Sequence, residues 1–407
     1  MIKNKKIIGL TFLYIPPSLG GYGGLYRFIQ ILNRICSFNL KFIIILNKSE
    51  WKAGSNDKKN TYVYINNFFS KYESSFKIRI ISSILRILLF TINGLRLSSY
   101  ISFVYVPSSE MLDLLIPAYI VSKIRKKSLI CVFQLPPPGM ISKNFSSTYN
   151  LYRRSGIGII NSILANFYAL LGRILAISIA NHSDAVIAVS NSLANDLKVL
   201  GLKKRIYVVP APLSFEKYPL KRSKKIKAIF VGRHTPEKGI IELLFVWRKI
   251  ISQLPEAILV MIGSCTHEMD KLIAHQIKQL KLNNNVHRLG VVSREKLFSE
   301  IQEAKLLIHL SHLEAQSYII KEALSLGTPV VCYDIPANRE FYTYKSVIRV
   351  PEGDLEAVYN EVLKLLRSEE TPIYHTIIQD RNWDDVSKEE YHIIKLVLNK
   401  GVKNGNY

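Results

Sequence analysis

Cysteine is scarce in this chain of 407 residues, and its four cysteines stand singly, without a CxxC pair or any metal-ligand spacing. This pattern gives no disulfide framework and no zinc site, and it predicts reduced, buried thiols in a cytosolic protein. Long apolar runs are also missing, because no uninterrupted stretch of about 18 apolar residues occurs. The nearest candidate, residues 157–180, is interrupted by Asn161, Asn166 and Arg173, so it predicts a core-facing helix. The apolar run near the N-terminus ends at Pro16, which predicts a first β-strand and not a signal peptide.

Acidic residues are scarce in only one half of the chain. Residues 1–210 contain 27 Lys and Arg against 7 Asp and Glu, a net charge of +20, whereas residues 211–407 contain 28 against 24, a net charge of +4. The basic half predicts an anionic partner, either a membrane surface or a nucleic acid. No RNP, KH or helix-turn-helix signature is present, so we expect no nucleic acid to bind. A codon bias toward Lys, Ile and Asn is the alternative explanation, although a bias would not remove acids from one half alone.

One segment of the basic half has polar residues at helical spacing. Arg79, Ser82, Arg86, Asn93 and Arg96 recur three, four or seven residues apart among Ile and Leu. This period predicts an amphipathic helix with a basic polar stripe. Such a stripe suits anionic lipid, and an ordinary surface helix of an α/β layer is the alternative.

The composition is that of a folded protein, with 48% hydrophobic and 21% charged residues. A chain of this length suits two or three domains with a large buried core. Apolar strands alternate with helical segments along the sequence, which predicts an α/β fold with parallel sheets.

The most informative stretch is a strand, helix and strand between residues 305 and 334. Residues 305–310 and 329–333 are short apolar runs that predict buried strands. For the helix between them, Ser317 is the predicted N-cap and Gly327 the left-handed residue after its end, with Pro329 as a stop.

Two carboxylates bracket this helix. Glu314 lies in the loop before it and Glu322 on its second turn, so the two stand roughly 10 Å apart at 1.5 Å per helical residue. Between them, the free N–H groups near Ser317, Tyr318 and Ile319 predict an anion site, which the helix dipole reinforces. Carboxylates accept hydrogen bonds from vicinal hydroxyls, so this arrangement suits a nucleotide-sugar. Solvated acids on an ordinary strand-helix-strand unit are the alternative.

Two further loops follow apolar strands. The loop GRHTPEKG at 232–239 carries Arg233 and Lys238, and two cations at a strand end and helix start can neutralise a diphosphate. A solvated basic turn is the alternative for this loop alone. The loop at 16–24 contains Gly21, Gly23 and Gly24 before a helix predicted at 25–38, an arrangement that lets backbone amides approach a phosphate.

The spacing of Glu314 and Glu322 resembles the Glu-x7-Glu motif of the retaining glycosyltransferases of family 4 (group 1), which have the GT-B fold. That fold consists of two facing Rossmann-like domains with a nucleotide-sugar cleft between them. The resemblance implies that Glu314 contacts the donor sugar and Glu322 the nucleotide ribose. The loop that is often Gly-Phe-Gly in the family is Ala-Gln-Ser at 315–317 here.

The other loops extend this resemblance. The string at 232–239 is similar to the family's Gly-Arg-x4-Lys-Gly motif, which implies that Arg233 and Lys238 bind the donor diphosphate. The glycine-rich loop resembles the family loop that lies near the donor phosphate and the acceptor. After the strand at 129–133, Gln134 stands where family members often carry a His, which implies a positional contact with a sugar hydroxyl.

Together these motifs imply a hexosyltransferase-type retaining glycosyltransferase (EC 2.4) with a front-face attack by the acceptor hydroxyl. Because no Asp-x-Asp motif is present, we expect no metal and no cofactor besides the nucleoside-diphosphate sugar. Glu314, Arg233 and Lys238 are the predicted catalytic residues. The substrate contacts are predicted from three glycines, a glutamine, two cations, the two carboxylates and the helix start: Gly21, Gly23, Gly24, Gln134, Arg233, Lys238, Glu314, Ser317, Tyr318, Ile319 and Glu322.

The resemblance also implies a domain organisation. Residues 1–212 are predicted to form an acceptor-binding domain, 213–227 a linker, 228–375 a donor-binding domain, and 376–407 a helix that crosses back to the first domain. With its basic first half, the protein is expected to act in the cytoplasm on a glycan or lipid-linked acceptor, as a peripheral protein of the inner membrane face. The alternatives are a non-catalytic relative that serves as a binding subunit and a nucleotide-sugar enzyme of the same fold, such as an epimerase.

Overall fold

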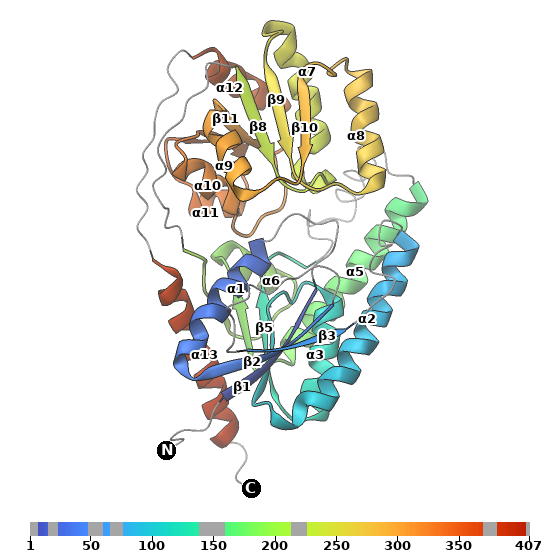
Figure 1. Cartoon of the computed structure of the whole chain (residues 1–407), viewed down its shortest axis with the longest axis vertical. Coiled ribbons are helices and arrows are strands. Elements are labelled where there is room, and N and C mark those ends of the chain that lie inside the picture. The colour runs from blue at the N-terminus through green and yellow to red at the C-terminus, as the bar shows by residue number, and fades with distance from the viewer. Residues whose placement is uncertain are drawn as a thin grey trace.

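The computed structural model describes residues 7–14, 23–47, 60–65, 76–137, 159–212, 226–368 and 381–403. Two parallel β-sheets form the cores of two domains, one above the other in Figure 1. The α/β prediction and the two facing Rossmann-like domains are confirmed.

The first domain has a seven-stranded sheet in the order β3-β2-β1-β4-β5-β6-β7, and every neighbouring pair is parallel. Its strands are short and mostly apolar on both faces, as expected for a sheet that helices cover on both sides. The strands are β1 (Ile7–Leu13), β2 (Leu40–Asn47), β3 (Thr61–Ile65), β4 (Phe103–Val106), β5 (Ser128–Phe133), β6 (Ala185–Ala188) and β7 (Ile206–Val208).

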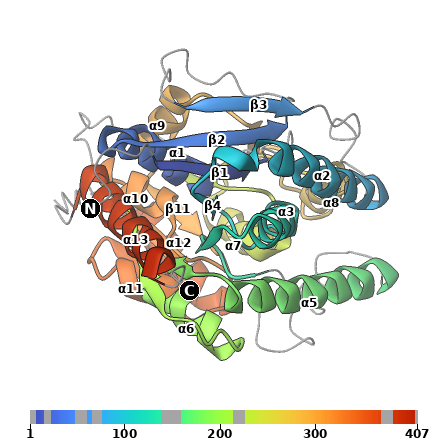
Figure 2. The same cartoon turned by 90° about the horizontal axis from the view of Figure 1, so that it is seen from below.

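Helices cover both faces of this sheet. One face packs against four helices, which are α2 (Phe76–Leu97), α3 (Leu112–Ile124), α5 (Ile159–Asn181) and α6 (Asn191–Val199). The other face packs against α1 (Gly23–Ile35) and α13 (Trp383–Lys403). Figure 2, seen from below, separates these two layers.

The second domain has a six-stranded parallel sheet in the order β10-β9-β8-β11-β12-β13. Its strands are β8 (Lys227–Val231), β9 (Ile258–Ile262), β10 (Val286–Gly290), β11 (Leu306–His309), β12 (Val330–Tyr333) and β13 (Val347–Val350). One face packs against α7 (Ile240–Gln253), α8 (His267–Gln279) and α12 (Leu355–Arg367). The other packs against α9 (Arg294–Glu303), α10 (Tyr318–Ser325) and the end of α11 (Pro336–Phe341).

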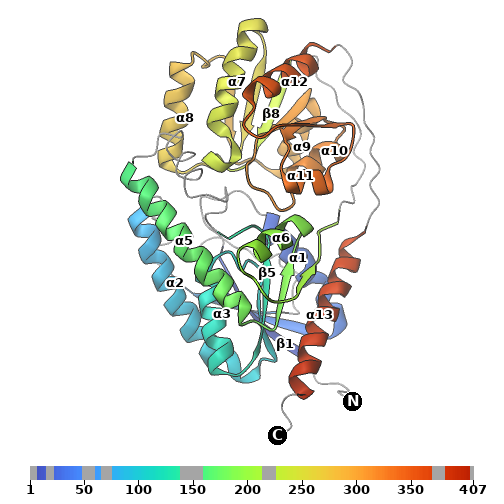
Figure 3. The same ribbon diagram turned by 180° about the vertical axis from the view of Figure 1, so that it is seen from behind.

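The last helix returns to the first domain. Figure 3 shows α13 beside α1, far from the second-domain helix α12 that precedes it in the chain. At its centre, the buried Glu390 carboxylate forms an ion pair with Arg27 at 2.6 Å and accepts a hydrogen bond from the Tyr105 hydroxyl at 2.6 Å. Trp383, the first residue of α13, packs edge-on against the Tyr26 ring of α1. These contacts attach α13 to the first domain.

Several local predictions need correction. The helix after the glycine-rich loop begins at Gly23, so Gly23 and Gly24 belong to the first turn of α1 and not to the loop. Lys227 is the first residue of β8 and not part of a linker, while residues 213–225 of the predicted linker lie outside the described residues. The same holds for residues 369–380, which include the predicted boundary at 375.

The amphipathic helix is present as α2, but the polar residues near its middle do not face solvent. The Arg86 side chain is buried, 3.2 Å from an Asp113 carboxylate oxygen and stacked over the Tyr14 ring. Ser82 is buried beside it. The part of the polar stripe at Ser82 and Arg86 is therefore not available to a partner, because it packs against α3 and the sheet.

Among the described residues, no helix is both long enough and apolar enough to cross a lipid bilayer.

Candidate active site

Two loops at the carboxyl ends of β8 and β11 lie side by side and bring the predicted charged residues together. The loop after β8 ends in a short 3-10 helix, Pro236–Lys238, and the loop after β11 leads through Glu314 into α10. Strands β8 and β11 are neighbours in the sheet, so both loops leave the same edge. Open α/β sheets bind ligands at this edge.

Glu314 is the centre of a buried polar cluster. Its Oε1 atom lies 2.5 Å from Lys238 Nζ and 3.1 Å from His309 Nε2. Lys238 Nζ also donates to Ser311 Oγ at 3.3 Å. Burial alone would raise the pKa of Glu314, but the Lys238 ammonium and the His309 hydrogen bond hold that pKa well below its usual range. The carboxylate is therefore ionised at all physiological pH values.

Glycine at position 239 allows this approach. Gly239 has a φ of 67°, in the left-handed region, and a Cβ atom there would collide with the carbonyl oxygen of Leu310. The glycine of the basic loop thus lets the chain after Lys238 pass directly against the end of β11. A side chain at this position would separate Lys238 from Glu314.

The start of α10 lies directly after Glu314. Ser317 occupies the N-cap position as predicted, but its side chain does not cap the helix. Ser317 Oγ instead lies 3.3 Å from His309 Nε2, so Ser317 belongs to the cluster around Glu314. Gly327 has a φ of 75°, which confirms the predicted left-handed residue after the helix. With no side-chain cap, the N–H groups at Tyr318 and Ile319 remain a candidate anion site.

The other predicted charged residues pair with residues of their own domain. Glu322 lies 3.6 Å from Arg294 of α9, and burial raises its pKa, while Arg294 acts in the opposite direction. Arg233 lies 3.8 Å from Glu237 and is partly exposed. Both side chains lie at the edge where Glu314 is found, but their roles on a donor stay predictions.

The first domain contributes one aromatic residue, Tyr26, beside the start of α10. The Tyr26 ring of α1 packs edge-on against the Tyr318 ring at the start of α10, with centroids 6.2 Å apart. Arg294 stands over the same Tyr26 ring at 5.7 Å. The helix start that contains Gly23 and Gly24 therefore belongs to the same region as the carboxylate-bracketed helix. Gly21 lies outside the described residues.

Gln134 is buried at the end of β5. Its side-chain amide donates to the carbonyl oxygen of Pro107 at 2.9 Å, and its backbone N–H donates to the Glu110 carboxylate at 3.2 Å. Sequence analysis did not single out Glu110. Burial raises its pKa to about 7, although hydrogen bonds from the backbone at Gln134 and Leu135 and from Ser108 act to lower it. A contact between Gln134 and a sugar hydroxyl stays a prediction.

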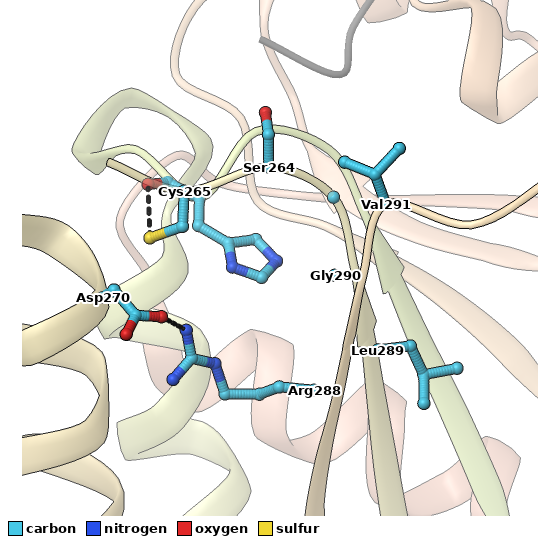
Figure 4. A pocket seen from close by; sticks show the side chains of 9 residues that line it. Ser264, Cys265, Asp270, Arg288, Leu289, Gly290 and Val291 are labelled. Carbon is cyan, nitrogen blue, oxygen red and sulfur yellow. Dashed lines mark hydrogen bonds and ion pairs between the residues drawn. The ribbon is translucent and has the colours of Figure 1, made fainter. Parts of the chain in front are cut away.

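A cavity of about 570 Å³ opens at the carboxyl ends of β8, β9 and β10. Figure 4 shows its side chains, with the Asp270–Arg288 ion pair on one side and Val291 on the other. The His234 ring lies against the cavity almost fully buried, and neither ring nitrogen has a partner among the described residues. Burial, with a smaller effect of Arg288, lowers the pKa of His234 to about 4, so the imidazole is neutral at pH 7. The sequence signal for this residue is its place inside the GRHTPEKG loop.

The two domains are joined by hydrogen bonds near the site. Gln316 Oε1 accepts from the Ala211 N–H at 2.9 Å, and Gln316 Nε2 donates to the Ala211 carbonyl at 2.9 Å. Lys321 Nζ donates to the carbonyl oxygen of Pro212. Glu340 accepts from the N–H groups at the start of α6 at 2.7 and 2.8 Å. The loop after Glu314 therefore contacts the end of the first domain directly.

His234, His309 and Glu110 are the residues of this region that no sequence pattern singled out. His309 is the last residue of β11, inside an apolar run that predicted only a strand. Its position five residues before Glu314 is the one signal that could have suggested a contact, because the loop between them is short.

Comparisons with known proteins agree with this geometry. Residues 214–379 match the family model described as glycosyl transferases group 1. The chain is 28% identical over 221 residues to the poly(glycerol-phosphate) alpha-glucosyltransferase of Bacillus subtilis. This alignment covers 51% of this chain and 31% of the relative. It is 24% identical over 175 residues to the phosphatidylinositol N-acetylglucosaminyltransferase GPI3 subunit of Saccharomyces cerevisiae, covering 42% and 38%. The chain thus spans less than two fifths of the length of these curated relatives.

Solved structures resemble the whole chain. The structure of Anabaena Alr3699/HepE in complex with UDP and glucose matches with a TM-score of 0.63 and 15% identity, covering 99% of this chain and 100% of that one. A variant of S. aureus TarM in complex with fondaparinux, alpha-GlcNAc-glycerol and UDP matches with a TM-score of 0.63 and 12% identity, covering 99% and 100%. The fold is therefore GT-B.

Proposed function

We propose that this GT-B protein, whose residues 214–379 match the group 1 glycosyl transferases, moves a sugar from a nucleoside-diphosphate sugar to an acceptor hydroxyl. The observation that carries the proposal is the cluster in which Lys238 and His309 hold the ionised Glu314 at the start of α10. A buried carboxylate, a cation and an uncapped helix start at one strand edge suit a sugar diphosphate, because each meets a different part of it.

The donor would extend along the edge of the second sheet. We assign its base to the cavity at His234 and Arg288, its ribose to Glu322, and its diphosphate to Arg233, Lys238 and the start of α10. Glu314 would then accept hydrogen bonds from the sugar hydroxyls. Support comes from the strand order β10-β9-β8-β11, because the cavity, the basic loop and Glu314 follow one another at the carboxyl ends of these strands. The UDP complexes of HepE and TarM make a UDP-sugar the first donor to test.

The proposed reaction retains the anomeric configuration. The bond between the anomeric carbon and the phosphate oxygen breaks, and its electron pair leaves with the diphosphate. The acceptor hydroxyl forms the new bond from the same face, and its proton passes to the leaving phosphate. Glu314 keeps the sugar in place, and the cations stabilise the charge that develops on the diphosphate, at about 3 kcal/mol for each well-placed donor.

Positive charge from the protein would replace a divalent cation in this reaction. Arg233, Lys238 and the α10 N-terminus supply that charge, so we propose that the transfer needs no metal and no other cofactor. Turnover measured with EDTA present tests this point directly. Activity that requires added Mg²⁺ or Mn²⁺ would contradict it.

We further propose an acceptor that is a glycan or lipid-linked saccharide at the cytoplasmic face of the membrane. The support is the +20 charge of residues 1–210, which favours an anionic substrate or surface. The two curated relatives carry poly(glycerol-phosphate) and phosphatidylinositol in their names, and both are anionic.

A thermal-unfolding screen against UDP-, GDP-, ADP- and TDP-sugars in EDTA tests the donor site. One nucleotide class should stabilise the protein by about 2.7 kcal/mol at a hundredfold excess over its dissociation constant. Product analysis then separates the candidate activities: transfer or slow donor hydrolysis supports the proposal, and an epimerised sugar without acceptor supports a different enzyme. Absence of stabilisation by every donor would favour a non-catalytic relative.

A further inference from the structure

Helix α2 exposes its apolar side. Ile81, Ile84, Leu88 and Ile92 are each between 47% and 54% exposed, and their spacing of three and four places them in one stripe along the helix. The opposite side of the helix buries Arg86. An ordinary surface helix has the reverse arrangement, so the outward stripe of α2 needs an explanation.

Helix α5 has a second stripe of the same kind. Ile163, Phe167, Leu170, Leu171 and Ile174 are between 37% and 64% exposed and fall within about a third of the helix circumference. Among the described residues, 16 large hydrophobic side chains are exposed, and nine of them lie on α2 and α5. Single exposed hydrophobic residues are common, whereas a concentration on two helices marks an interaction surface.

Both helices lie on one side of the first domain. Figure 2 shows α2 and α5 extending in the same direction with α3 between them, and Figure 1 shows that their N-terminal ends point toward the second domain. Their N-termini are therefore at the same end of the domain as the carboxyl ends of β4 and β5, where Gln134 and Glu110 lie.

The charge of this region identifies the kind of partner. Neither α2 nor α5 contains an Asp or Glu. Residues 76–181 as a whole hold twelve Lys and Arg against two Asp and Glu, and one of these acids, Asp113, is paired with Arg86. Arg96 is exposed near the end of the α2 stripe, and Arg173 lies beside Ile174 on α5. Apolar stripes in a strongly basic setting with few acidic residues complement an anionic lipid surface.

We infer that α2 and α5 form the surface with which the protein docks on an anionic lipid bilayer. The apolar side chains enter the interface between headgroups and acyl chains, and the surrounding Lys and Arg contact anionic headgroups. Docking on this side would bring the carboxyl ends of β4 and β5 near the membrane, because the N-termini of both helices lie at that end of the domain. Only the presence of an acceptor near this surface rests on the proposed function. The docking surface itself is inferred from the exposure of the apolar side chains and the positive charge around them.

Vesicle co-sedimentation of the full chain, without donor or acceptor, tests the surface. Wild-type protein should bind vesicles that contain phosphatidylglycerol and bind phosphatidylcholine vesicles much more weakly. The double variant Leu88→Glu/Phe167→Glu should lose at least tenfold in affinity for the anionic vesicles. The uncharged variant Leu88→Ser/Phe167→Ser should lose several-fold, which isolates the apolar contribution from the charge.

The matched control is Val199→Glu/Phe245→Glu, which makes the same change in charge at apolar residues that are 69% and 46% exposed on α6 and α7. It should bind vesicles within about twofold of the wild type. Equal losses in both double variants would show that net charge alone drives binding, and would overturn the inference. The wild type could instead fail to bind vesicles and form dimers that the Leu88→Glu/Phe167→Glu variant dissociates. This face would then be a self-association surface, and the inference of membrane docking would also be overturned.

Circular dichroism and thermal unfolding show whether each variant is folded. Nucleotide-sugar stabilisation separates this inference from the proposed function. If the protein binds vesicles but no nucleotide-sugar stabilises it, the membrane surface is supported and the glycosyltransferase site is contradicted. If a nucleotide-sugar stabilises the protein but the protein does not bind vesicles, the site is supported and the membrane surface is contradicted.

Discussion

Lys238 and Glu314 form an ion pair, with 2.5 Å between Nζ and Oε1, at the edge of the second sheet. The cation that we assign to the diphosphate is therefore paired with the carboxylate that we assign to the sugar. Donor binding would have to share or break this pair, because a phosphate oxygen and Glu314 would compete for the same ammonium.

The ion pair between Lys238 and Glu314 predicts different roles for the carboxylates of Glu314 and Glu322. Glu314→Gln should lower kcat by about 10²- to 10³-fold, while the Kd of the nucleoside diphosphate stays the same or falls, since Lys238 is released. Glu322→Gln should raise that Kd with a smaller effect on kcat. Steady-state kinetics and calorimetry measure the two quantities. Full activity in a Glu314/Glu322 double alanine variant would show that the site is assigned wrongly.

His309 should act as a positioning residue for Glu314. His309→Ala removes the donor that lies 3.1 Å from the carboxylate, so kcat should fall about tenfold with little change in nucleotide Kd. His309→Gln restores an N–H donor at a similar reach and should recover part of that loss. A purely structural role predicts instead that the melting temperature falls and that the glutamine variant recovers only stability.

Glu110 should make stability depend on pH. Its pKa rises to about 7 in the folded protein from an ordinary 4.5, so the folded state holds a proton that the unfolded state has lost between these values. Stability contributed by this group is present below pH 4.5 and declines as pH rises to 7, by about 1.4 kcal/mol per pH unit. Denaturant titrations from pH 4.5 to 8 should show that Glu110→Gln lacks this decline. Parallel curves for the two proteins would refute the assignment.

Gln316 should control the contact between the domains. Gln316→Leu leaves the Ala211 N–H and carbonyl without their partners, which costs about 1–3 kcal/mol for each buried group. The variant should melt at a lower temperature and give a larger radius of gyration by small-angle scattering. Gln253→Leu, which changes an exposed glutamine within the second domain, is the matched control. Equal effects in both variants would argue against a role in joining the domains.

Local patterns were sufficient for much of the fold. The strands at the core are short apolar runs, and burial on both faces of a parallel sheet requires such runs, so β5, β11 and β12 could be predicted from sequence. Gly327 was predictable for the same local reason, because a left-handed residue just after a helix favours glycine. The left-handed conformation of Gly239 was not predicted. Lys238 and Glu314 were selected by their spacing in loops that follow strands, and Glu322 by its place on the helix after Glu314. The sheet then brings Lys238 and Glu314 into contact.

Tertiary structure alone decided the rest, because the relevant partners are distant in the chain. The pairing of Gln316 with Ala211 spans 105 residues, and no local pattern encodes it. The side of α2 that is buried at Arg86 was not predictable for a similar reason: periodicity identifies two faces of a helix, but Asp113 and Tyr14 decide which one is buried. The sequence by itself thus determined which segments form strands, helices and charged loops. Packing between distant segments determined which charges are paired, which domains touch and which apolar side chains remain exposed.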